Sequence, residues 1–130
     1  MNKPNQQTAT KMLQLVDLST YQGRITYLAI AFLCQTGATF AEAARLTIGD
    51  VYSHSRPKKW VRIPADTPLS CTMLVGPAAR KTVKLVLEVQ GQHGLVPYRS
   101  APLFPTPGGE AFTADQLASI FSMYRQAAEG

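Results

Sequence analysis

Seven basic side chains gather in one segment of the chain, between residues 56 and 84. The only acidic residue there is Asp66, so the segment carries a net charge of +6, while the remaining residues sum to −1. Such a segment favours contact with a polyanion, because each phosphate that it neutralises releases a condensed counterion. The alternative is a solvated basic face on an ordinary globular protein. The candidate phosphate contacts are Lys58, Lys59, Arg62, Arg80, Lys81 and Lys84.

Side chains that could act as nucleophiles or metal ligands are present, but none has a suitable partner residue at a spacing typical of a catalytic or metal site. His54 and His93 have no Asp or Cys partner at a useful spacing, and no serine lies in a nucleophile-elbow motif. Cys34 and Cys71 form no C-x-x-C pair, and we expect both to be small buried hydrophobic residues. The sequence therefore predicts no metal site, no cofactor and no catalytic residue of these types.

Length and composition indicate one globular unit. The chain has 130 residues, of which 45% are hydrophobic and 16% are charged, which is enough apolar material for one core. We expect a frayed N-terminus over residues 1–7 and a single domain over residues 8–130. The longest apolar run, Ile25–Cys34, is too short to cross a bilayer, and no leader-like segment opens the sequence. A cytoplasmic protein without membrane contact is expected.

Capping residues and apolar periodicity predict four to five helices. Thr39 with Glu42, and Thr113 with Gln116, each have the spacing of a capping box, and Gly37 has the residue type that ends a helix in a left-handed conformation. The long segment 91–109 is expected to be a surface loop that docks through Leu103-Phe104. The expected helices cover residues 8–18, 25–35, 39–46 and 77–90, and a last one opens at Thr113.

Two short runs rich in strand-forming residues, Trp60–Ile63 and Cys71–Val75, predict one antiparallel β-hairpin. Pro64 favours an edge position for the first strand. Trp60 is expected in the core or packed at an edge, because aromatic and basic residues do not alternate around it. The fold class is therefore α+β and mainly helical.

The order of these elements resembles the N-terminal part of the catalytic domain of tyrosine recombinases, the phage integrase family. That family has an approximate motif T-G-x-R-x-x-E-x-x-x-L, followed a few residues later by D. The resemblance covers nearly the whole chain, but only about half of such a domain. It implies an integrase-like half-domain whose capped helix and hairpin face DNA. The residues that match in register are Thr36, Gly37, Glu42, Leu46 and Asp50, with Pro102–Pro105 in the later loop.

The catalytic residues of that family are missing from the matching positions. The first arginine falls on Thr39, and the hairpin turn, residues 66–70, has no lysine. No H-x-x-R motif and no tyrosine in that context occur in these residues. Threonine supplies neither permanent charge nor bidentate donors to a phosphate, so we expect no cleavage or joining of DNA. Gly37, Thr39, Glu42 and Asp50 then remain as structural residues.

The resemblance and the charge together imply a non-catalytic DNA-binding protein. It would contact double-stranded DNA weakly, through phosphates, and act in DNA recombination, integration or their regulation on a mobile element. The alternative is a protein-interaction module that self-associates or pairs with a full-length recombinase, because half a catalytic domain is expected to expose an apolar face. A piece of a longer active enzyme is less favoured, because position 39 already departs from the motif.

Overall fold

The computed structural model describes residues 4–53, 56–63, 71–96 and 98–130. Within them the chain forms six helices and two small antiparallel sheets, which confirms the mainly helical α+β class. In this described part no helix is both long and apolar enough to span a membrane. The helices are α1 (Gln6–Leu15), α2 (Tyr21–Thr36), α3 (Phe40–Arg45), α4 (Ile48–Val51), α5 (Pro77–Gln92) and α6 (Ala114–Glu129). The strands are β1 (Tyr52–Ser53), β2 (Arg56–Pro57), β3 (Trp60–Ile63) and β4 (Cys71–Leu74).

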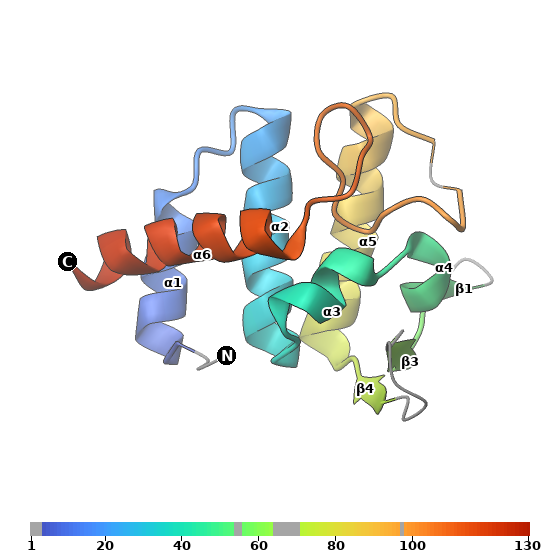
Figure 1. Cartoon of the computed structure of the whole chain (residues 1–130), viewed down its shortest axis with the longest axis horizontal. Coiled ribbons are helices and arrows are strands. Elements are labelled where there is room, and N and C mark those ends of the chain that lie inside the picture. Colours follow the sequence, from blue (N-terminus) through green and yellow to red (C-terminus); the bar gives the residue numbers. More distant parts are fainter. Residues whose placement is uncertain (1–3, 54–55, 64–70, 97) are drawn as a thin grey trace.

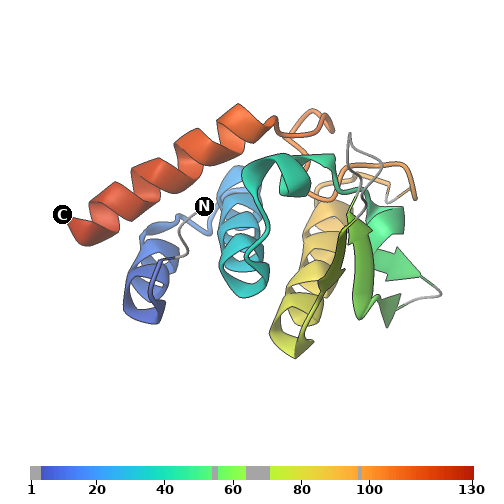
Figure 2. The ribbon, with the colours of Figure 1, turned by 60° about the horizontal axis from the view of Figure 1, so that its bottom comes forward.

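Helix α2 is the centre of the core, and α5 packs antiparallel beside it (Figure 1). Near one end of the pair the Thr82 hydroxyl donates to Gln35 Oε1 at 2.8 Å. At the other end the rings of Tyr21 and His93 stack with their centroids 3.9 Å apart. Helices α1 and α6 cover one flank of α2, and the hairpin β3–β4 lies at the far side of α5 (Figures 1 and 2).

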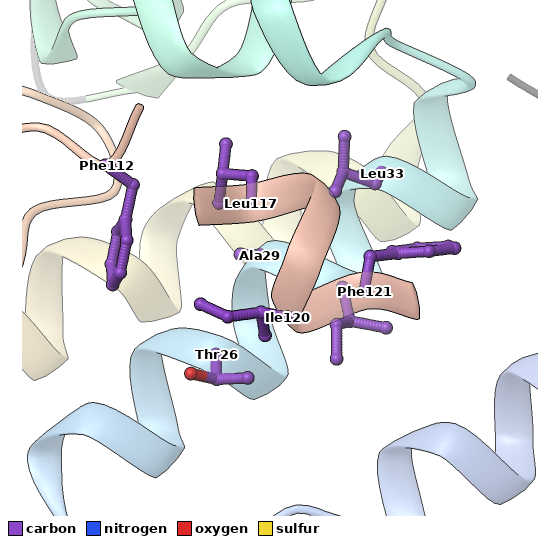
Figure 3. A pocket seen from close by; sticks show the side chains of 8 residues that line it. Thr26, Ala29, Leu33, Phe112, Leu117, Ile120 and Phe121 are labelled. Atoms are coloured by element: carbon purple, nitrogen blue, oxygen red, sulfur yellow. The ribbon is translucent and has the colours of Figure 1, made fainter. Parts of the chain in front are cut away.

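Helix α6 crosses over α2 and closes the core from above (Figure 3). Leu117, Ile120 and Phe121 from α6 lie against Ala29 and other side chains of α2. The crevice between them has a volume of only about 10 Å³, which is at the lower limit for one water molecule. This contact is therefore packing, and it leaves no room for a ligand.

The predicted helix ends are confirmed where a side chain caps the backbone. Thr39 Oγ1 accepts from the Glu42 amide at 3.1 Å, and Thr113 Oγ1 accepts from the Gln116 amide at 3.1 Å. Gly37 ends α2 with a φ of 73°, the left-handed conformation that glycine adopts without strain. These local signals are strong because the threonine caps satisfy amides that the first turn of a helix leaves free, and the Gly37 amide satisfies a carbonyl of the last turn of α2.

Three elements differ from the prediction. Helix α1 begins at Gln6, because the Asn5 side chain accepts from the Thr8 amide at 2.7 Å; of the expected frayed end, residues 1–3 lie outside the described residues. Helix α4 is an additional short helix, since the Asp50 carboxylate accepts from the Thr47 amide at 2.9 Å and so opens a turn. Strands β1 and β2 form a second small hairpin directly after it.

The long loop before α6 docks as predicted. Leu103 and Phe104 are buried, and the rings of Phe104 and Phe32 meet edge to face at 5.5 Å. The buried Gln90 side chain donates to the Leu103 carbonyl at 2.9 Å, which satisfies polar groups of the loop and of α5 at once. The hairpin β3–β4 also forms as predicted, with its turn, residues 64–70, outside the described residues.

The partly buried phenol of Tyr21 predicts a loss of stability at high pH. Its hydroxyl donates to the Pro105 carbonyl at 3.1 Å, and burial raises the pKa of Tyr21 from 10.0 to about 12. The unfolded chain ionises first, so this stability is complete below pH 10 and is lost as the pH rises toward 12. We expect the free energy of unfolding, measured with urea, to fall less between pH 10 and 12 in Tyr21→Phe than in the wild type. Equal losses would contradict the assignment of this pH dependence to Tyr21.

Candidate nucleic-acid interface

The hairpin β3–β4 has a buried face and an exposed face. Val61 pairs with Met73, and both are buried against the core. Because side chains alternate along a strand, the neighbouring pair Arg62 and Thr72 points the other way, and both residues are exposed. The predicted phosphate contact Arg62 therefore lies on the outer face of the hairpin.

Trp60 lies on that same outer face, so of its two predicted places, the core or an edge, the core is wrong. The Trp60 side chain is 59% exposed, and its cross-strand neighbour Leu74 is 50% exposed. The reason is the strand period, because Val61 points inward and Trp60 and Arg62 must then share the opposite face. The order Trp-Val-Arg contains this signal, since an arginine that faces solvent places the tryptophan two residues earlier on its own side.

Lys58 and Lys59 belong to the short connection that leads from β2 into β3. The Lys58 amide donates to the Val51 carbonyl at 2.7 Å, and the Lys59 carbonyl accepts from the Val75 amide at 2.7 Å. These bonds fix the backbone on both sides of the connection. Lys59 is exposed and Lys58 is partly buried, so both lysines extend from a backbone that is fixed at the edge of the hairpin.

The other three predicted contacts lie in the first two turns of α5. Lys81 and Lys84 are exposed on the side of the helix opposite to the buried Thr82 and Val86. Arg80 is partly buried, and its Nε atom has no hydrogen-bond partner among the described residues. No side chain caps α5, so its first amides add partial positive charge near these cations.

The fold brings the two basic groups to one end of the molecule. Strand β4 leads into α5 through only Val75 and Gly76, and α5 packs against β2 (Figure 2). No acidic residue occurs within residues 56–63 and 71–87, and the first carboxylate beyond them on α5 is the exposed Glu88, one turn after Lys84. We call the six predicted contacts the basic surface: Lys58, Lys59, Arg62, Arg80, Lys81 and Lys84.

Position 39, where the resemblance requires an arginine, is occupied by an uncharged helix cap. Thr39 lies between the end of α2 and the start of α3, as the N-cap residue of α3. Its amide donates to Glu42 Oε1 at 2.8 Å, and its hydroxyl accepts from the Glu42 amide. Both the amide and the hydroxyl of Thr39 are therefore used in the helix cap. The side chain is uncharged, so it offers no fixed positive charge to a phosphate.

The remaining reactive side chains have structural surroundings. Cys34 is buried, as predicted, and the side chain of Cys71 lies outside the described residues. His93 is exposed, stacks on Tyr21 and holds its Nε2 atom 3.2 Å from the Pro107 carbonyl oxygen; His54 is outside the described residues. In the part of the chain that the structure covers, no three His, Cys, Asp or Glu side chains lie together as a metal site would require.

Comparison with known proteins gives a likeness of fold. No protein-family model matches the sequence, and no curated protein matches it. Among solved structures, the fold is similar to a lambda integrase, residues 75–356, crystallised as a dimer bound to a COC′ core site, with a TM-score of 0.69 and 12% sequence identity. The match covers 99% of this chain and 43% of that one, so this chain spans less than half of its length. The fold of these residues is thus that of a tyrosine recombinase catalytic region, as the resemblance implied.

Proposed function

We propose that this integrase-like chain is a non-catalytic DNA-binding protein that acts in DNA recombination, integration or their regulation on a mobile element. Its partner is double-stranded DNA in the cytoplasm. The observation that carries the proposal is the basic surface, which combines cations of the hairpin region and of α5 and has no carboxylate within residues 56–63 and 71–87. The lambda integrase of similar fold is bound to a core site, which supports the same class of partner.

The chemistry of the basic surface favours contact with phosphates over contact with bases. Lysine and arginine side chains on a strand edge and on the flank of a helix can reach the DNA backbone, which positions a protein without reading sequence. If four to six of them each meet a phosphate, the logarithm of the affinity falls with the logarithm of the salt concentration with a slope of roughly −4 to −5. Binding should therefore be weak at physiological salt and tolerant of sequence.

The absence of catalysis is proposed from Thr39 and from the hairpin sequence. A scissile phosphate needs fixed positive charge, and loss of one such donor commonly costs about 10²- to 10³-fold in rate. Thr39 engages its hydroxyl and amide in the capping box, and residues 60–75 contain no lysine. Both differences lie within the matched region, so they do not depend on where the chain ends.

Two measurements on the whole chain test this function. We expect labelled duplex DNA to bind at 50 mM salt and to lose roughly 10²- to 10³-fold in affinity at 200 mM salt, as four to five phosphate contacts require. We expect no covalent adduct on a nicked suicide substrate that traps a tyrosine–phosphate bond. Binding that does not depend on salt, or no binding at 50 mM, contradicts phosphate-directed contact, and a trapped adduct contradicts the absence of catalysis.

A protein-interaction module is the second candidate, and exposed apolar side chains near α1 favour it. Leu15, Leu18 and Met123 are each at least half exposed. Crevices of about 420 and 530 Å³ border α1 and α2 and are lined in part by Leu13. Sedimentation over a wide protein concentration separates the two functions, because a monomer at every concentration that still binds duplex DNA supports DNA binding over self-association.

A further inference from the structure

The outer face of the hairpin displays a tryptophan that the core does not use. The inner face already buries Val61, Met73 and Val75, which fix the hairpin on the body of the protein. Trp60 and Leu74 form a pair on the opposite face and are both at least half exposed. Exposing a large aromatic side chain to water is unfavourable, and in this position the side chain contributes little to the stability of the fold. We therefore expect it to serve in binding.

Basic residues flank Trp60 along the chain. Arg62 lies two residues after Trp60 on the same face of the strand, and Lys59 lies immediately before it. Segment 56–63 contains four basic residues and no acidic one. An apolar ring between cations matches a nucleotide, which combines a flat base with a charged phosphate, better than it matches an apolar protein surface.

We propose that Trp60 stacks on an unpaired base while Arg62 and Lys59 bind the neighbouring phosphates, so that the hairpin holds single-stranded or locally unpaired DNA. The inference rests on the proposed DNA-binding function and adds a substrate class to it. A paired duplex hides the faces of its bases within the stack, so an exposed indole gains little from it. The same basic surface would then bind duplex through phosphates and bind unpaired DNA through phosphates and stacking.

Leu74 extends the apolar platform. In an antiparallel pair the Cβ atoms of facing residues are about 5 Å apart, so Leu74 lies beside the indole on the same face. A base stacked on Trp60 could therefore rest its sugar or its edge against Leu74. This geometry predicts one main stacking position on the described hairpin and a weaker apolar contact next to it.

The intrinsic fluorescence of the protein reports directly on this position, because Trp60 is the only tryptophan in the chain. The experiment titrates the whole chain with a short oligothymidine, with a blunt duplex and with inorganic polyphosphate at equal phosphate concentration. We expect oligothymidine to quench the emission and polyphosphate to leave it nearly unchanged. We also expect Trp60→Ala to weaken oligothymidine binding roughly tenfold, as loss of one stacked base does, and to change duplex affinity less than twofold. Trp60→Phe, which keeps an aromatic face, should retain most of the affinity.

The outcomes separate this inference from the function on which it rests. If duplex binds with the expected salt dependence, but Trp60→Ala weakens both nucleic acids equally or neither, stacking is wrong and DNA binding stands. If neither nucleic acid binds at low salt, both proposals fail. If the emission changes with protein concentration alone and Trp60→Ala converts a dimer to a monomer in sedimentation, a second copy covers the indole and the inference is overturned.

Discussion

Replacing Arg62, Lys81 and Lys84 together by glutamine is expected to weaken binding to duplex DNA by roughly 10²- to 10³-fold at 0.1 M salt. The three side chains are exposed and come from two elements, β3 and α5, which are connected through β4 and the two residues after it. Each lost phosphate contact removes about 0.9 from the salt slope, which is roughly eightfold in affinity between 0.1 M and 1 M salt. Fluorescence anisotropy of a labelled duplex at several salt concentrations measures both the affinity and the slope.

A matched variant removes the same charge from helices that carry no residue of the basic surface. Lys11, Arg24 and Arg125 lie on α1, α2 and α6. Their replacement by glutamine should change duplex affinity no more than about threefold, since charges beyond about 10 Å are screened at this ionic strength. If both triple variants weaken binding equally, net charge and not the basic surface governs it, and the proposed interface is wrong.

Most of the helical framework could be predicted because its signals are local. A threonine followed three residues later by Glu or Gln satisfies free amides within one turn, so Thr39 and Thr113 mark helix starts without reference to the rest of the fold. Gly37 does the same at a helix end. Asn5 caps α1 by the same physics, but no Glu or Gln three residues later reinforced that signal.

The surface around the hairpin was predicted only in part, because it depends on contacts between distant segments. Arg62 and Lys81 are far apart in sequence, and only the pairing of β3 with β4 and the entry into α5 bring their elements together. Which face of β3 is buried is decided by α4 and the core, so a pattern of four residues alone did not place Trp60 on the exposed face. The partial burial of Arg80 likewise follows from tertiary packing and carries no local signal.

Gly23→Ala is expected to lower the free energy of unfolding by about 2 kcal/mol, as overpacking commonly does. Gly23 lies in the first turn of α2, where helix propensity alone would favour alanine. A Cβ atom at this position would fall on the carbonyl oxygen of Asp17 and would also lie 3.1 Å from Thr20 Oγ1. The turn before α2 is braced, since Asp17 Oδ1 accepts from the Ser19 amide at 2.9 Å and from its hydroxyl at 2.7 Å.

Gly91→Ala is the matched substitution, in the last turns of α5, and it should have the opposite sign. No heavy atom lies within 4 Å of the Cβ atom that this change adds, so the expected result is a gain of about 0.5–1 kcal/mol from helix propensity. Urea unfolding at constant m-value measures both variants. Because both glycines are helical, propensity predicts the same sign for the two, and only the approach of the Asp17 carbonyl separates them. If both substitutions stabilise the protein, the turn before α2 moves to accommodate the new Cβ atom. Opposite signs would show that the close contact between Gly23 and the Asp17 carbonyl fixes the path of the chain from α1 into α2.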